Sequence, residues 1–295
     1  MAFKVICGKS YFSSLQSLAK ELGKNLSLDT TNYVIVPNGK ALYIKNQIMK
    51  ALDKDGIFNL KVLDFVTLAK QTAGFAQKYI TDEQGLLIFK SILKKCKNNL
   101  KSFYKIVGND SAERELYGVL AILAKSCVSP QNLKSAGVNL GGILGAKAED
   151  IAELYEIYYK CLDGKFANNH ILINNLVQNI KSGYFAGSNF FVYGFSTLSG
   201  EETRLINALG ECGYNLYFYG VANSKGENKR IYPRFSDDIC NKFNIKAEIC
   251  EQYEVYTQDI ELLLDNLFGF NNSANEQARN ISIRCADTVC LEVKG

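Results

Sequence analysis

Short, continuously apolar segments that alternate with helical periodicity constrain the fold of this chain most strongly. Residues 3–7, 33–36 and 60–63 are such segments, and each is followed by apolar residues at helical spacing. Strands that are buried on both faces and alternate with helices are typical of parallel α/β sheets. Residues 1–79 therefore predict the first part of an α/β domain.

The pattern changes between Ile80 and Ile180, where we find no convincing strand. Apolar residues recur there at helical spacing in four segments, at 86–93, 116–123, 151–162 and 171–180. A group of glycines is expected to form a loop between the helices, at Gly137, Gly141, Gly142 and Gly145. Residues 80–183 therefore predict a large all-helical insertion subdomain.

The α/β alternation resumes after the insertion. Residues 189–193 and 216–219 predict buried strands, and Ser199 and Glu202 have the spacing of a capping box at the start of a helix. A helix is expected at 256–268 and a strand at 281–285. Residues 184–295 therefore predict the completion of the α/β domain. Because the last strand stops abruptly at Gly295, we expect a C-terminally truncated segment of a longer protein.

Composition narrows the function only slightly. The net charge of +4 permits nucleic acid as a partner without arguing for it. Nine scattered cysteines without a CxxC pair predict buried free thiols, and the single histidine leaves little for metal or triad chemistry. No apolar run reaches the roughly 18 residues of a membrane span, and the start lacks a signal peptide. The expected location is the cytoplasm, without a membrane partner.

The tripeptide Gly8-Lys9-Ser10 after the first strand invites comparison with a P-loop, G-x-x-x-x-G-K-[ST]. If Gly8 were the second glycine, the first would be Phe3, inside the strand. If Gly8 is the first glycine, serines stand at the positions of the second glycine and of the lysine. We therefore expect a degenerate nucleotide loop, made of Gly8, Lys9, Ser10, Ser13 and Ser14.

The strand that would carry the magnesium-binding carboxylate lacks it as well. P-loop motors place an aspartate at its end, whereas this strand ends in Val-Tyr-Gly-Phe, with Tyr193 at that position. Glu201 and Glu202 lie in the following helix, where acidic residues favour the positive end of the helix dipole. We expect no catalytic residue and no metal site in this segment.

An ordered set of motifs resembles one family across essentially the whole chain. In the family's notation these motifs are V-P-E-Q, V-x-S-F-x-x-L-A, G-V-S-P-x-x-L, I-Y-E-x-Y and V-D-G-F. Their counterparts here lie at 34–39, 62–69, 128–133, 154–158 and 192–195. The chain is similar to the N-terminal region of the B subunit of AddAB-type (RexAB-type) ATP-dependent helicase–deoxyribonucleases, the AddB family.

This resemblance implies a superfamily-1-like, P-loop-helicase fold that no longer works as a motor. It implies DNA and an AddA-like helicase–nuclease subunit as partners in the repair of double-strand breaks. It also implies ATP and magnesium in the partner subunit, and an iron–sulfur cluster in a C-terminal nuclease domain outside this segment. The sequence departs from the family where it loses a GSGKT-like loop and where Tyr193 replaces aspartate.

The loops after parallel strands form the ligand face of such a sheet. This rule predicts single-strand DNA contacts from Asn38, Lys40, Phe65 and Thr67, although Phe65 could instead pack in the core. Asp64 is expected to be a helix N-cap. Two other functions stay open: an active P-loop ATPase motor, and a protein–protein interaction module without DNA contact.

Other charged segments are weaker candidates. Lysines surround two aromatic residues at 94–105, and a second basic stretch covers 225–234. Each could contact phosphates, but a solvated surface is the simpler explanation. His170 is expected to be a surface residue.

Overall fold

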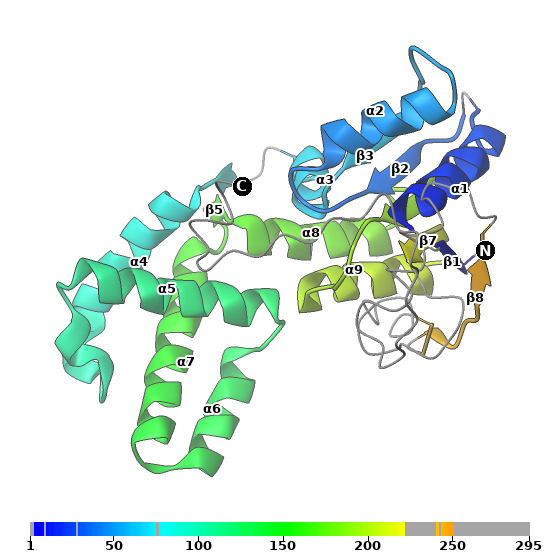
Figure 1. Ribbon diagram of the computed structural model, residues 1–295. Helices are drawn as coiled ribbons and strands as arrows, with labels where there is room; N and C mark the ends of the chain where they lie inside the picture. Colours follow the sequence, from blue (N-terminus) through cyan, green and yellow to red (C-terminus); the bar gives the residue numbers. More distant parts are fainter. Residues whose placement is uncertain are drawn as a thin grey trace, which may run out of the picture.

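A computed structural model describes residues 3–8, 10–27, 29–74, 77–221, 240–241 and 243–250. Within them, a sheet covered by helices on both faces is joined to a helical unit that projects to one side (Figure 1). The predicted helix at 256–268, the predicted strand at 281–285 and the basic stretch at 225–234 lie outside the described residues.

The sheet has six strands in the order β3-β2-β6-β7-β1-β8, and every pairing is parallel. Its strands are β1 (Phe3–Gly8), β2 (Asn32–Ile35), β3 (Leu60–Leu63), β6 (Asn189–Tyr193), β7 (Asn215–Val221) and β8 (Ala247–Ile249). The apolar segments at 3–7, 33–36, 60–63 and 189–193, which are predicted to form strands of one mainly parallel sheet, all lie in this sheet.

The continuous apolar character of the strands follows from burial on both faces. Val34 packs in one hydrophobic cluster and its neighbour Ile35 in the other, and both side chains are fully buried. Helices α1 (Tyr11–Lys24) and α2 (Ala41–Ala51) contribute to the cluster on one face. Helices α3 (Phe65–Thr72), α8 (Asn169–Lys181) and α9 (Gly200–Glu211) contribute to the cluster on the other.

The helical unit has its own hydrophobic core. It contains α4 (Asp82–Cys96), the short 3₁₀ helices η1 (Lys97–Asn99) and η2 (Phe103–Ile106), α5 (Asp110–Lys125), α6 (Pro130–Leu140) and α7 (Gly142–Leu162). Phe89, Leu120 and Tyr158 from three of these helices pack together. The antiparallel pair α6–α7 projects from the helical unit as a hairpin (Figure 1). Helix α8, expected in the insertion, instead packs on the sheet through residues such as Leu176.

The absence of strands between Ile80 and Ile180 was a wrong prediction. Strand β4 (Lys78–Tyr79) pairs in parallel with β5 (Phe166–Ala167), and this two-stranded sheet joins the two ends of the helical unit. A two-residue strand shows no periodicity, so the sequence pattern could not reveal it.

The predicted glycine loop is also wrong. Gly137 lies in α6 and Gly145 in α7, and only Gly141 lies between the two helices. A Cβ added to Gly145 would lie 2.7 Å from the Gly137 carbonyl oxygen. These glycines therefore serve close helix packing, because any side chain would push the hairpin apart.

Two predicted helix caps are confirmed. The Asp64 side chain accepts a hydrogen bond of 2.7 Å from the Thr67 backbone N–H at the start of α3. Ser199 and Glu202 form a complete capping box at the start of α9. Both caps satisfy amide groups that a helix start leaves without intrahelical partners.

Three asparagines fix the register at the amino ends of β2, β6 and β7. Asn32, Asn189 and Asn215 are opposite one another across adjacent strands. Asn189 Nδ2 donates to Asn32 Oδ1 at 3.0 Å, and Asn215 Nδ2 donates to Asn189 Oδ1 at 2.9 Å. A shift of either neighbouring strand by one residue would break one of these bonds.

Candidate nucleic-acid interface

The carboxyl ends of β1, β2, β3 and β6 bring the predicted site residues to one edge of the sheet. The strands are parallel, so the segments that follow Gly8, Ile35 and Tyr193 all leave at this edge. Ligands of open α/β sheets bind at such an edge.

The loop after β1 is filled by its own side chains. Ser10 caps α1, and its Oγ accepts a hydrogen bond of 3.1 Å from the Ser13 N–H. The Ser14 hydroxyl donates to the Gly220 carbonyl at 2.5 Å and accepts from the Gly8 N–H at 3.2 Å. Ser13 and Ser14 are buried. Lys9 lies outside the described residues.

The space beside Gly8 is occupied as well. A Cβ added there would lie 2.8 Å from Ser14 Oγ and 3.1 Å from Cys250 Sγ. Helix α1 already begins at Tyr11, and the Ser14 N–H bonds the Ser10 carbonyl. A P-loop instead directs successive backbone N–H groups at a phosphate, so the described part of this loop does not have the arrangement of a P-loop.

Tyr193, the last residue of β6, lies at the same edge of the sheet and is tied to the start of α1. Its hydroxyl donates to the Tyr11 carbonyl at 2.7 Å, and the Tyr11 and Tyr193 rings meet edge to face with centroids 6.4 Å apart. Burial raises the pKa of Tyr193, so the phenol stays neutral. A neutral phenol is a poor substitute for the carboxylate that holds magnesium.

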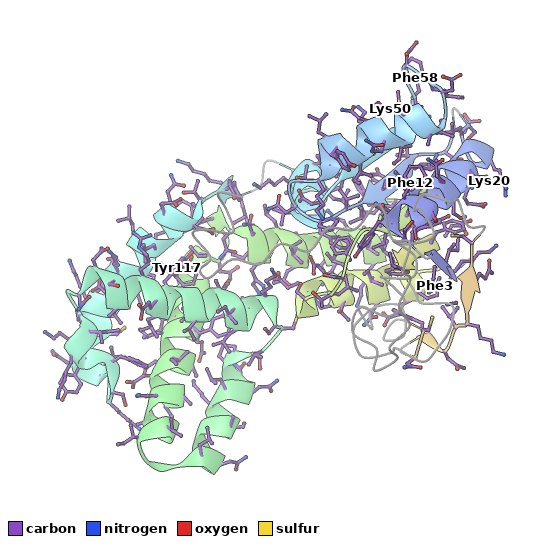
Figure 2. All side chains as sticks on the ribbon, in the orientation of Figure 1. Phe3, Phe12, Lys20, Lys50, Phe58 and Tyr117 are labelled. Carbon is purple, nitrogen blue, oxygen red and sulfur yellow. The ribbon has the colours of Figure 1, made fainter. Side chains whose placement is uncertain are left out.

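A pocket of about 350 Å³ opens between α1 and α2 beside Tyr193. We call it the aromatic pocket; its polar and aromatic lining comprises Tyr11, Phe12, Lys40, Tyr43, Gln47 and Tyr193. Tyr43 is 64% exposed, and Tyr11 and Phe12 are about two-fifths exposed. Phe12 is labelled on α1 in Figure 2. Exposed aromatic rings beside a lysine can stack bases and contact phosphate.

The predicted DNA-contacting residues have different outcomes. Asn38 and Lys40 are exposed in the turn before α2, and Thr67 is exposed in the first turn of α3. Phe65, by contrast, is 4% exposed and packs against Phe195 at 5.9 Å between ring centroids. A stacking role for Phe65 is therefore wrong, because its ring fills the core beneath α3.

Sequence reasoning missed the aromatic pocket. Tyr11, Phe12 and Tyr43 stand in two helices that are separated by a strand, and only the packing of α1 beside α2 brings them together. The available signal was their place in the first turn of each helix, directly after a strand.

Other sequence expectations need correction. His170 is half-buried, and its Nδ1 hydrogen bonds the buried carboxylate of Glu201, so it is not a plain surface residue. Cys127, Cys161 and Cys212 are exposed, contrary to the prediction of buried thiols. In the lysine-rich segment at 94–105, Lys101 pairs with Glu149.

Two further features bear on cofactors and membranes. The described residues contain no group of three or more potential ligands that could hold a metal ion. Within the same part of the chain, no helix has both the length and the apolarity that a membrane crossing requires.

Comparison with known proteins gives a consistent result. The family described as "ADDB, N-terminal" matches residues 5–239. Two relatives, from Listeria welshimeri and Alkaliphilus metalliredigens, are each named as the B subunit of an ATP-dependent helicase/deoxyribonuclease. They are 24% and 21% identical to this chain, over 72% and 84% of its length. The matches cover 19% and 23% of those proteins, so this chain spans about a fifth of their length. Because the family match covers most of the sequence, the chain belongs to the family of ADDB N-terminal regions.

Proposed function

We propose that this chain is a helicase-like module without ATPase activity that serves scaffolding and single-strand DNA contact in a DNA-repair helicase–nuclease complex. The relatives' name, which describes the B subunit of an ATP-dependent helicase/deoxyribonuclease, supports the type of complex. In this proposal an AddA-like partner supplies ATP hydrolysis with magnesium. Residues 1–79 and 184–221 contribute the α/β domain, and residues 80–183 contribute the helical insertion except for α8, which packs on the sheet.

The loop after β1 supports the absence of hydrolysis. Ser10 and Ser14 already bond the amides of Ser13 and Gly8, and the strand-end position that would hold magnesium is Tyr193. Phosphoryl transfer needs preorganised positive charge around the phosphate and an anchored metal ion. Because the aligned lysine position is Ser14 and the aligned magnesium position is Tyr193, we expect the chain to turn over no ATP.

The aromatic pocket is the observation that carries the DNA contact. Stacking of one base on an aromatic side chain contributes about 1–3 kcal/mol, and Tyr43 presents the most exposed ring of the pocket. Lys40 stands beside it in the lining and offers its charge to the adjoining phosphate. Asn38 extends the same edge with a side-chain amide. Thr67 offers only the oxygen of its hydroxyl group as an acceptor, because the hydroxyl donates to Asp64 Oδ2 at 3.1 Å.

A matched pair of variants on α2 tests the DNA contact. Tyr43→Ala should weaken binding of a fluorescent oligothymidine about tenfold, the effect expected for one lost stacking contact. Leu42→Ala removes the neighbouring side chain, which is 73% exposed and does not line the pocket, and should leave the affinity unchanged. Lys40→Ala should lower the slope of log affinity against log salt by about 0.7. Equal behaviour of Tyr43→Ala and Leu42→Ala would refute the pocket.

ATP turnover by the purified chain, measured with and without single-stranded DNA, tests the other half of the proposal. We expect none above background. Turnover that Lys9→Ala abolishes would show that the loop is intact, and it would restore the alternative of an active motor.

The alternative of a protein–protein interaction module is favoured by one observation. The tip of the α6–α7 hairpin carries aliphatic side chains that are 61–75% exposed, at Val138, Leu140, Ile143 and Leu144. Clustered exposed apolar residues mark interaction surfaces. This function would be supported if a helicase–nuclease partner co-purifies with the wild type and is lost with the double variant Ile143→Ser/Leu144→Ser. That result would exclude DNA contact by this chain only if Tyr43→Ala also leaves the affinity for oligothymidine unchanged.

A further inference from the structure

A second pocket lies where the helical unit meets the helices of the sheet. It has a volume of about 350 Å³, and we call it the junction pocket. Its lining includes Tyr155 and Tyr159 of α7, and, from the helices on the sheet, His170 and Asn174 of α8 and Arg204 of α9. The segment at 127–130, which leads into α6, completes the lining.

A chain of hydrogen bonds connects α8 and α9 at this pocket. Arg204 donates to Asn174 Oδ1, which leaves Asn174 Nδ2 facing His170 Nε2 at 3.1 Å. His170 Nε2 is therefore the acceptor, and Nδ1–H donates to Glu201. The pairs 170–201 and 174–204 follow one another in the same direction, so α8 and α9 run parallel.

The parallel arrangement places the junction pocket at the carboxyl edge of the sheet. Helix α9 follows β6, whose last residue, Tyr193, is part of the aromatic pocket. Because α8 runs parallel to α9, the amino ends of both helices lie at this edge, and their positive dipole ends favour an anion there. The side-by-side course of α8 and α9 is visible in Figure 1.

The charge of the lining favours an anion as well. Among the described residues that line the junction pocket, none is acidic, and Arg204 supplies a permanent positive charge. Glu201 instead lines a smaller pocket of about 180 Å³, which shares Tyr159 and His170 with the junction pocket. The buried Nε of Arg204 has no hydrogen-bond partner among the described residues.

We propose that the junction pocket binds one backbone phosphate of the single DNA strand whose base stacks in the aromatic pocket, with Arg204 as the principal contact. This inference rests on the proposed function. A guanidinium matches the geometry of phosphate oxygens better than an ammonium group does. Tyr155 and Tyr159 supply phenol groups, and burial raises the pKa of both, that of Tyr155 to about 12, so both stay protonated.

Two variants that remove one positive charge each provide the test. Arg204→Met removes the charge from the junction pocket, whereas Lys125→Met removes it from the neighbouring smaller pocket, which Lys125 lines. Binding of oligothymidine to the full 295-residue chain is measured by fluorescence anisotropy between low and moderate salt. Arg204→Met should lower the affinity about tenfold and the salt slope by about 0.7, and Lys125→Met should change neither.

The outcomes separate this inference from the proposed function. If Tyr43→Ala weakens binding and Arg204→Met does not, the aromatic pocket stands and the phosphate site is refuted. If the wild-type chain binds no oligothymidine, both fail. If the junction pocket instead binds an acidic protein partner, Arg204→Met should bind DNA as the wild type does. Unchanged DNA binding by this variant would therefore refute the proposal that the pocket binds DNA.

Two further measurements guard against ambiguity. If Arg204→Met does not fold, Arg204→Lys takes its place. This variant should keep the salt slope but bind oligothymidine severalfold more weakly, because lysine lacks the planar guanidinium group. An unchanged affinity would refute the phosphate site. Inorganic phosphate is then titrated against the wild type and the folded Arg204 variant during thermal unfolding. Stabilisation of the wild type alone, together with unchanged DNA affinity of the variant, would indicate a free-phosphate site and overturn the DNA assignment.

Discussion

The asparagine ladder at the amino ends of β2, β6 and β7 gives the sharpest stability prediction. Asn189→Ala removes both bonds of the ladder, each worth about 1 kcal/mol net. It also leaves the Asn32 Oδ1, whose residue is fully buried, without its donor, which costs a further 1 kcal/mol or more. We therefore expect a loss of about 3 kcal/mol in the free energy of unfolding. Asn215→Ala breaks only one bond of the ladder, and the loss of that bond should cost about 1 kcal/mol.

Urea unfolding, followed by far-ultraviolet circular dichroism, measures these losses. The chain has no tryptophan, so the helical signal is the better probe. Asn139→Ala is the control, because Asn139 is exposed on α6, and surface substitutions change stability by about 0.5 kcal/mol or less. A double-mutant cycle between Asn32 and Asn189 isolates their coupling. A cost of Asn189→Ala no larger than that of Asn215→Ala would refute the ladder as a source of stability.

The remaining predictions concern packing at the junction and a buried phenol. Gly200→Ala should destabilise the chain by about 1–3 kcal/mol, because the new Cβ would lie 2.8 Å from the Ser126 carbonyl at the end of α5. Gly118→Ala, with open space around it, should be neutral or stabilising in the same urea unfolding assay. The pKa of Tyr155 is raised by burial from 10 to about 12, so the unfolded chain loses this proton first and the free energy of unfolding should fall as pH rises from about 10 to 12. In urea unfolding measured across this pH interval, the free energy of unfolding of Tyr155→Phe should fall less than that of the wild type. An identical fall for both proteins would contradict the raised pKa of Tyr155.

Family resemblance and helix caps were accessible from sequence because they depend on residues close together in the chain. The capping box of Ser199 and Glu202 spans one helical turn, and the Asp64 cap acts on Thr67. The predicted nucleotide loop was local too, and the lack of glycine and lysine could be read directly. Its filling by Ser14, however, depends on the Gly220 carbonyl, 206 residues away in the sequence.

The sequence by itself determined that a parallel α/β sheet is interrupted by helices, because a strand buried on both faces must be continuously apolar. It did not determine where α8 packs, since an amphipathic helix reveals that it has a buried face but not which partner covers it. Only the tertiary structure decided that Phe65 is core and that Tyr43 meets Phe12 across one pocket. It also decided that Arg204 meets His170 at the junction. These groupings join side chains from separate elements, and their contacts follow from packing in three dimensions and leave no periodic signal in the chain.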